Sequence, residues 1–148
     1  AVKGVDAVIL FPFTGPETEK AWIQACRKER LGLIVGGEMT HKGFLESEGG
    51  FIAEKDSLKI YEVAVDGKIN DFVVPGNKPE KIKLYKAFLE ARGINPVFYS
   101  PGLITQGGDI TESAKAAGSK WHAIVGRALY NSKDINKTVK ELVRNLIK

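Results

Sequence analysis

The chain has 148 residues, of which 43% are hydrophobic and 27% are charged. These proportions are typical of a soluble globular domain, argue against disorder, and suit one domain with a sizeable core. No apolar run approaches the ~18 residues of a membrane helix. The single cysteine, Cys26, excludes a disulfide framework and a metal site built on several cysteines. With no secretory signal at the N-terminus, we expect a cytoplasmic protein that does not engage a membrane.

The formal net charge is +4, from 22 Lys and Arg against 18 Asp and Glu. The two signs are interspersed along the chain and form no basic stripe. We interpret them as a solvated surface and expect no nucleic-acid partner.

Short apolar runs alternate with helical segments along the chain. The predicted strands are residues 8–11, 33–35, 72–74, 97–99 and 123–125. The predicted helices are residues 16–30, one within 45–65, 79–92, a short one after Asp109, and 134–147. Continuous apolar runs are typical of strands that are buried on both faces.

This alternation predicts a parallel α/β sheet. Most strands recur about every 25 residues, near the ~30 per unit of a (β/α)8 TIM barrel. Five units cannot close such a barrel, and residues 1–4 look like the end of a helix. We therefore expect residues 1–148 to form the C-terminal part of a single barrel domain. The alternative is a small, open doubly wound domain.

A glycine-rich loop follows the fourth predicted strand, at the end where α/β proteins bind ligands. Gly107 and Gly108 let the backbone approach a ligand, Gln106 can donate hydrogen bonds, and the helix start after Asp109 offers N–H groups to an anion. The loop is long enough to close over a site. A plain glycine-rich connection with a capping aspartate explains the same residues equally well.

A second signal follows the fifth predicted strand. Gly126 offers an unobstructed backbone N–H, and Arg127 offers a fork that suits phosphate. Phosphate sites of (β/α) barrels commonly use the loops after strands seven and eight. If these are those two loops, the chain holds units four to eight of a barrel.

Three motifs carry a resemblance to a known family. Residues 38–43 (Glu-Met-Thr-His-Lys-Gly), 100–102 with 106–109, and 125–130 (Val-Gly-Arg-Ala-Leu-Tyr) resemble orotidine 5′-phosphate decarboxylase of the archaeal type. The resemblance runs along essentially the whole chain. It implies a carboxy-lyase of pyrimidine biosynthesis that needs no cofactor, removes CO2 from orotidylate to give uridylate (UMP), and forms a homodimer.

The resemblance also assigns site residues. It implies phosphate binding by Gln106, Gly107, Gly126 and Arg127. Thr40, where the family commonly has serine, would hydrogen-bond the pyrimidine. The closing loop would include Pro101, Gly102, Leu103 and Gly108.

The chain departs from the family in its catalytic motif. The family's Asp-x-Lys-x-x-Asp lies on a strand that we expect upstream of Ala1, so we predict no catalytic residue in this chain and no activity for the chain alone. Residues 66–71 have the same spacing, but they form a polar Asp-Gly turn before a strand, and we interpret them as surface. Residues 11–12, Phe-Pro, stand where relatives often have His-Gly.

Other interpretations stay open beside this one. The chain can be a non-catalytic phosphate-binding fragment, or belong to a related barrel enzyme that processes sugar phosphates. Glu38 and His41 have a metal-ligand spacing, but no second copy accompanies them, so we predict no metal. An incomplete barrel exposes strand edges, so we expect the isolated chain to self-associate or to be poorly soluble.

Overall fold

The computed structural model describes residues 4–104 and 107–144. Its strands form one parallel sheet in the order β1-β2-β3-β4-β5, in which each strand pairs with the next one along the chain. The strands are β1 (Ala7–Leu10), β2 (Gly32–Gly36), β3 (Asp71–Val73), β4 (Val97–Ser100) and β5 (Trp121–Ala123). The predicted parallel α/β alternation is therefore confirmed.

Helices connect these strands. They are α1 (Pro16–Glu29), the short 3-10 helix η1 (Glu46–Glu48), α2 (Glu54–Asp66), α3 (Pro79–Glu90), α4 (Ile110–Ala117), α5 (Arg127–Tyr130) and α6 (Ile135–Val143). Pro16 and Pro79 occupy first-turn positions, where a missing N–H costs nothing. Helix α5 was not predicted, because its four residues are too few for a periodic pattern.

The fifth strand lies two residues earlier than predicted. Trp121 pairs with Phe98, and Ala123 pairs with Ser100. The Trp121 indole Nε1–H donates to Ser100 Oγ at 2.9 Å, which ties the start of β5 to the end of β4. The apolar pair Ile124 and Val125, on which the prediction rested, continues past the strand.

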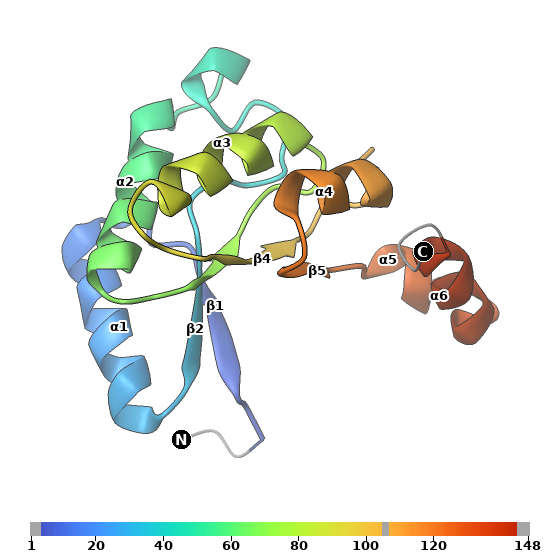
Figure 1. Ribbon diagram of the computed structural model, residues 1–148, viewed down its shortest axis with the longest axis horizontal. Helices are drawn as coiled ribbons and strands as arrows, with labels where there is room; N and C mark the ends of the chain where they lie inside the picture. The colour runs from blue at the N-terminus through green and yellow to red at the C-terminus, as the bar shows by residue number, and fades with distance from the viewer. Residues whose placement is uncertain (1–3, 105–106, 145–148) are drawn as a thin grey trace.

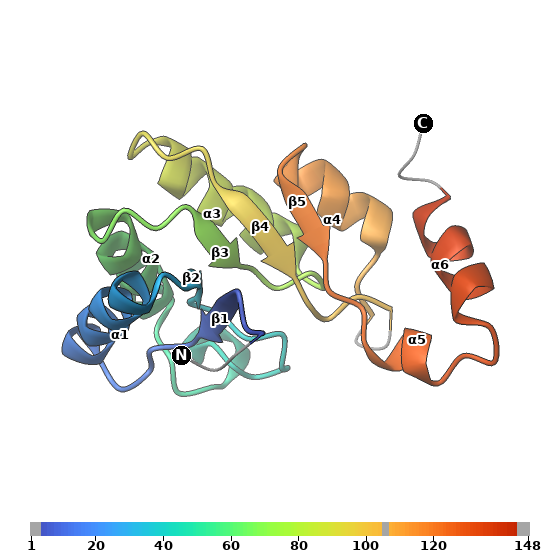
Figure 2. The ribbon, with the colours of Figure 1, turned by 90° about the horizontal axis from the view of Figure 1, so that it is seen from below.

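Helices α1 to α4 cover one face of the sheet (Figures 1 and 2). The core lies between these two layers. From the strands it contains Leu33, Val35, Phe72 and Phe98, and from the helices Ile23, Tyr61, Ile82, Tyr85 and Leu89. Each strand sends alternate side chains into this core, as the two-residue period requires.

The other face of the sheet is not covered within the part of the chain that the structure describes. Ile9 is 50% exposed, and Ile124 is 37% exposed. A polar cluster lies on neighbouring strands: the Tyr99 hydroxyl donates to Asp71 Oδ1 at 3.1 Å, and the Tyr99 and His122 rings stack 4.8 Å apart. The prediction of strands buried on both faces is wrong for these residues, because the helices pack on one face alone.

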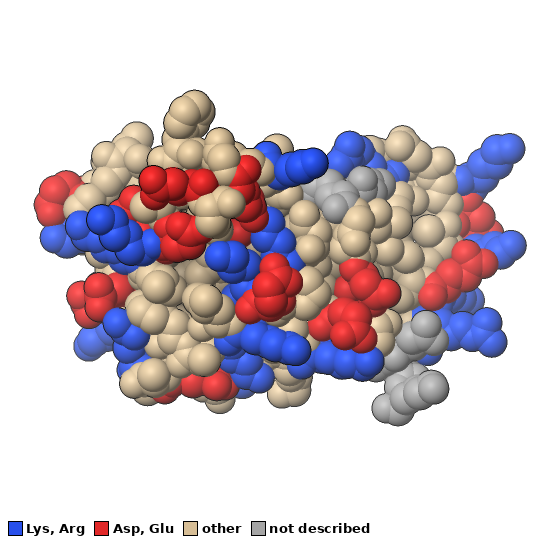
Figure 3. All heavy atoms as spheres, turned by 90° about the horizontal axis from the view of Figure 1, so that it is seen from above, with Lys and Arg blue, Asp and Glu red and all other residues tan. Residues whose placement is uncertain are grey.

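Helix α6 lies away from the sheet and contacts α5 (Figure 2). Its apolar residues Ile135 and Val139 are exposed. Lysines and arginines alternate with acidic residues over the helical side of the molecule, as the interspersed sequence predicts (Figure 3). Among the described residues, no helix combines the length and apolar character needed to cross a membrane.

Candidate functional site

The carboxyl ends of the five strands meet at one edge of the sheet, since all the strands are parallel. This edge is where open α/β sheets and barrels bind ligands. The loop after β2 brings Thr40 to it, the loop after β3 brings Asn77, and the loop after β5 brings Arg127.

The loops after β2 and β3 are joined by hydrogen bonds. Asn77 Nδ2 donates to the Thr40 carbonyl oxygen at 3.0 Å. The Ser57 hydroxyl, from α2, donates to the Gly37 carbonyl at 2.8 Å. These bonds fix the backbone at Thr40, whose hydroxyl has no hydrogen bond to any described residue. Asn77 Oδ1 is buried and also lacks a partner in residues 4–104 and 107–144.

A buried ion-pair network lies beneath these loops. The Glu38 carboxylate is fully buried and accepts hydrogen bonds from Lys78 Nζ at 2.7 Å and from the Tyr85 hydroxyl. Lys78 also contacts Glu48. Burial acts to lower the pKa of Lys78, but the hydrogen bonds to Glu38 and Glu48 outweigh it, so that pKa lies above its usual value. The Glu38 oxygens are thus taken up by a cation and a phenol, while His41 is exposed.

The glycine-rich loop after β4 is anchored at its base. Gly76 N–H donates to the Pro101 carbonyl at 2.8 Å, and Ile104 N–H donates to the Gly108 carbonyl at 2.9 Å. Leu103 is 3% exposed and forms a bridge with Gly108. A Cβ at Gly108 would lie 2.8 Å from the carbonyl oxygens of Gly76 and Gly102, so only glycine fits there.

Most of the predicted closing-loop residues therefore form a fixed base. Gly102 and Gly107 have φ angles of +86° and +84°, which glycine adopts without strain. The predicted phosphate ligand Gln106 lies outside the described residues.

Two amides at the start of α4 are already occupied. The Asp109 carboxylate accepts from Thr111 N at 2.7 Å and from Glu112 N at 3.0 Å. The predicted capping by Asp109 is confirmed. The expectation of unpaired N–H groups that face an anion is wrong for Thr111 and Glu112, because the Asp109 carboxylate already accepts from both.

Arg127 begins α5 directly after Gly126, and its side chain is exposed. Its guanidinium has no hydrogen bond or ion pair with any described residue. Ile124 N–H donates to the Ser100 carbonyl at 3.0 Å, so the loops after β4 and β5 leave the sheet side by side. The strand ends thus present an unpaired cation beside the glycine-rich loop.

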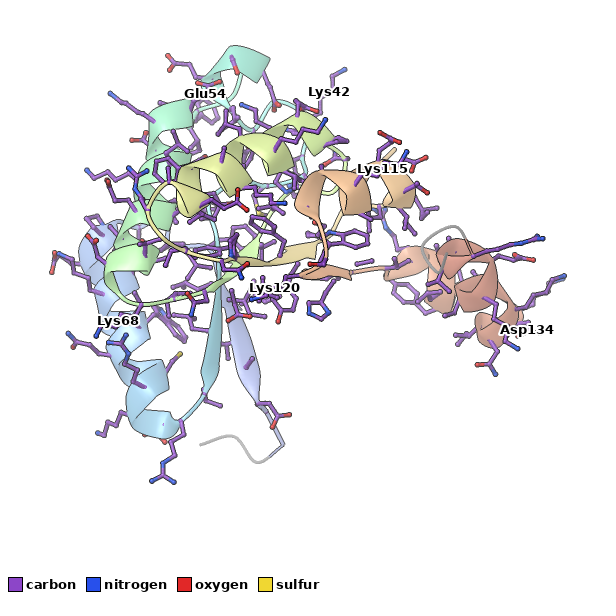
Figure 4. All side chains as sticks on the ribbon, in the orientation of Figure 1. Lys42, Glu54, Lys68, Lys115, Lys120 and Asp134 are labelled. Carbon is purple, nitrogen blue, oxygen red and sulfur yellow. The ribbon has the colours of Figure 1, made fainter. Side chains whose placement is uncertain are left out.

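The segment with the Asp-x-Lys-x-x-Asp spacing lies elsewhere. Residues 67–70 connect the end of α2 to the start of β3, at the opposite edge of the sheet. Figure 4 shows Lys68 at the end of α2 far from Glu54 and Lys42. Lys68 has a φ of +54°, as in a tight turn. The interpretation of this segment as a surface turn is confirmed.

Comparison with known proteins places the chain in a family. A model of the Orotidine 5'-phosphate decarboxylase / HUMPS family matches residues 1–142. This chain belongs to that family. Among curated relatives, the orotidine 5'-phosphate decarboxylase of Methanosarcina mazei is 30% identical over 97% of this chain, and that of Pyrococcus abyssi is 31% identical over 94%. The chain spans 60% of the length of each.

Solved structures of family members have the same fold. Orotidine 5'-monophosphate decarboxylase from Methanocaldococcus jannaschii, complexed with the inhibitor BMP, superposes on 97% of this chain with a TM-score of 0.80 and 27% identity. The enzyme from Pyrococcus horikoshii OT3 superposes on 98% with a TM-score of 0.72 and 28% identity. This chain covers 62% of each. The predicted TIM-barrel fold class and the family resemblance are confirmed.

Sequence reasoning missed the residues that support the site. The roles of Asn77 and Lys78 could not be predicted, because an asparagine and a lysine before a helix are typical of a solvated loop. The pairing of Lys78 with Glu38 joins residues 40 positions apart, which no local pattern reveals. A Pro-Glu helix start at residues 79–80 was the one nearby clue.

Proposed function

We propose that this chain forms the phosphate- and base-binding part of an orotidine 5′-phosphate decarboxylase, which converts orotidylate to uridylate and CO2. The observation that carries the proposal is the exposed Arg127 at the start of α5, in the segment after β5, which has no hydrogen bond or ion pair with any described residue. Family membership and the names of the relatives support the reaction.

In this proposal, Arg127 and Gln106 bind the 5′-phosphate together with the backbone N–H groups of Gly107 and Gly126. The planar guanidinium suits bidentate phosphate binding. The Thr40 hydroxyl, held in place through the Asn77 bond to its carbonyl, contacts the pyrimidine. Closure of the glycine-rich loop after β4 then expels water, and phosphate binding energy contributes to assembling the site around the base.

The chemical step needs groups that we assign to a part of the protein outside this chain. Decarboxylation breaks the bond between the pyrimidine and its carboxylate, and the carbanion left behind takes a proton from the family's lysine. That lysine belongs to an Asp-x-Lys-x-x-Asp strand, whereas residues 66–71 run from the end of α2 to the start of β3, at the edge of the sheet opposite the candidate site. The uncovered sheet face and the 60% coverage of the relatives support three further β/α units. With these units we expect a cytoplasmic homodimer.

The test distinguishes binding of the phosphate group from binding of the base. We would titrate the protein with UMP and with ribose 5-phosphate by calorimetry, using Arg127→Ala, Thr40→Val and a control, Lys120→Ala. Lys120 precedes β5 at the opposite end of the strand, so its substitution removes the same charge away from the site.

We expect Arg127→Ala to weaken both ligands about tenfold to hundredfold, because a charge-assisted pair is lost. Thr40→Val weakens UMP alone, by about fivefold, the worth of one neutral hydrogen bond. Equal losses in Arg127→Ala and Lys120→Ala would refute the phosphate site. Equal affinity for both ligands in the parent chain would favour a sugar-phosphate enzyme of the same family.

Decarboxylation is measured on the same samples, after intact mass confirms the chain. We expect no turnover of orotidylate by residues 1–148 alone. Clear turnover would overturn the assignment of the chemical groups to another part of the protein, and would return attention to Asp66, Lys68 and Asp71.

A further inference from the structure

A cavity of about 210 Å³ lies between the loop after β1 and the two helices α1 and α2. Its apolar walls come from Pro12 and Phe13 in the loop and from Ile52 and Ile60 on the α2 side. None of these residues takes part in the proposed binding of phosphate or base. The cavity is smaller than the ~300 Å³ at which pockets for drug-sized ligands begin, so its occupant has to be small.

Glu19, on α1, is one of the residues that line this cavity. Its side chain is 1% exposed, and its Oε1 atom has no hydrogen-bond partner among the described residues. Burial raises the pKa of this carboxyl to about 7. A buried carboxyl without a partner costs free energy, so a structure that retains one calls for an explanation.

Residues 4–104 and 107–144 supply no partner cation for Glu19. Lys59 and Asp56, on α2, are the other charged residues that line the cavity, and neither forms an ion pair with Glu19 in the described ranges. The favourable interaction of a carboxylate with the α1 dipole does not require burial, because the exposed Glu17 in the same turn already provides it. The Glu19 carboxyl therefore remains available to a donor outside the described residues.

The apolar walls of the cavity and the Glu19 carboxyl together define the chemistry of that donor. Apolar walls favour a short hydrocarbon stem, and a buried carboxylate favours a positively charged head group that donates hydrogen bonds. We propose that this cavity binds a small organic cation, a primary ammonium on a short apolar stem, with Glu19 as its hydrogen-bond acceptor.

The experiment uses three probes that share a four-carbon apolar group. We would titrate the protein at pH 8 with n-butylammonium chloride, 1-butanol and sodium butyrate, and follow binding by calorimetry. The variants are Glu19→Gln, which keeps the shape and removes the charge, and Glu17→Gln as the control. Glu17 lies on the same helix, two residues away, with its side chain 85% exposed.

We expect saturable binding of butylammonium to one site, with 1-butanol and butyrate at least about tenfold weaker, because they lack the charge-assisted bond. Glu19→Gln weakens butylammonium by the same factor, and Glu17→Gln leaves it within about twofold. The parent protein also binds butylammonium more weakly at pH 6 than at pH 8, since Glu19 takes up a proton over this interval. That comparison needs no variant.

Three results would each overturn the proposal: equal binding of butylammonium and 1-butanol, unchanged binding in Glu19→Gln, or no saturation. A fourth result that would overturn it involves a second copy of this chain. If butylammonium dissociates a dimer in sedimentation, and Glu19→Gln has the same effect, the donor is a side chain of the second copy rather than a free amine.

Discussion

Glu19 makes the stability of this protein depend on pH in a direction opposite to that of most carboxyl groups. Its pKa is about 7 in the folded state and 4.5, the ordinary value, in the unfolded chain. Between these values the folded state binds a proton that the unfolded state has released. The free energy of unfolding therefore falls as the pH rises from 4.5 to 7, and the loss is complete above pH 7.

The size of this loss follows from the difference between the two pKa values. They differ by about 2.5, and each pH unit corresponds to about 1.4 kcal/mol, so the carboxylate destabilises the fold by about 3 kcal/mol at pH 8. Glutamine has nearly the same shape and cannot ionise. We expect Glu19→Gln to be about 3 kcal/mol more stable than the parent at pH 8, and to lose most of this advantage at pH 5.

Urea unfolding of both proteins at pH 5 and pH 8 measures the effect. Other groups titrate over this interval, but their contributions cancel when the variant is compared with the parent at each pH. Glu17→Gln is the matched control, because the exposed Glu17 carboxylate pairs with Lys20 at the surface and contributes little. The same difference between Glu19→Gln and the parent at both pH values would refute the reasoning.

Three further predictions concern the frame of the site and the open sheet. Lys78→Met leaves the buried Glu38 without a cation, so we expect it to lower the free energy of unfolding by about 3 kcal/mol or more in the same urea assay. Arg92→Met breaks an exposed ion pair with Glu62, so we expect it to lower the free energy of unfolding by less than about 1 kcal/mol. Asp109→Ala loses two capping bonds and about 1 kcal/mol in thermal unfolding, while Asp109→Asn stays near the parent. The uncovered face around Ile9 predicts self-association, and a monodisperse 16.2 kDa monomer in sedimentation would contradict it.

Local backbone chemistry explains why so much of the fold was predictable. Pro16 and Pro79 mark helix starts, Asp109 marks a cap, and the apolar runs mark strands, each through interactions within a few residues. The consecutive strand order follows from the alternation of strands and helices. The family motifs predicted candidate loops at the strand ends for the same reason, because glycines at positions such as Gly108 depend directly on backbone geometry.

The sequence could not reveal interactions that depend on distant partners. Trp121 belongs to β5 because its indole reaches Ser100, a contact between different strands. Glu19 and Glu38 are both buried, yet a glutamate in a helical or loop segment normally predicts a solvent-exposed side chain. The prediction that the strands are buried on both faces was wrong. Apolar side chains indicate that a strand tends to be covered, but they do not show which segment covers it.

The arrangement of charge at the strand ends shows why these distant pairs matter for binding. A free Glu38 carboxylate beneath the loops would repel a phosphate dianion, but Lys78 neutralises it. Arg127, in contrast, has no partner among the described residues, so its charge stays available to a ligand. The paired charges of Glu38 and Lys78 thus support the loops, whereas the Arg127 charge, which has no partner among the described residues, is exposed at the edge where the ligand is expected. In the proposed function, this positive charge attracts the anionic phosphate of the substrate to the strand ends.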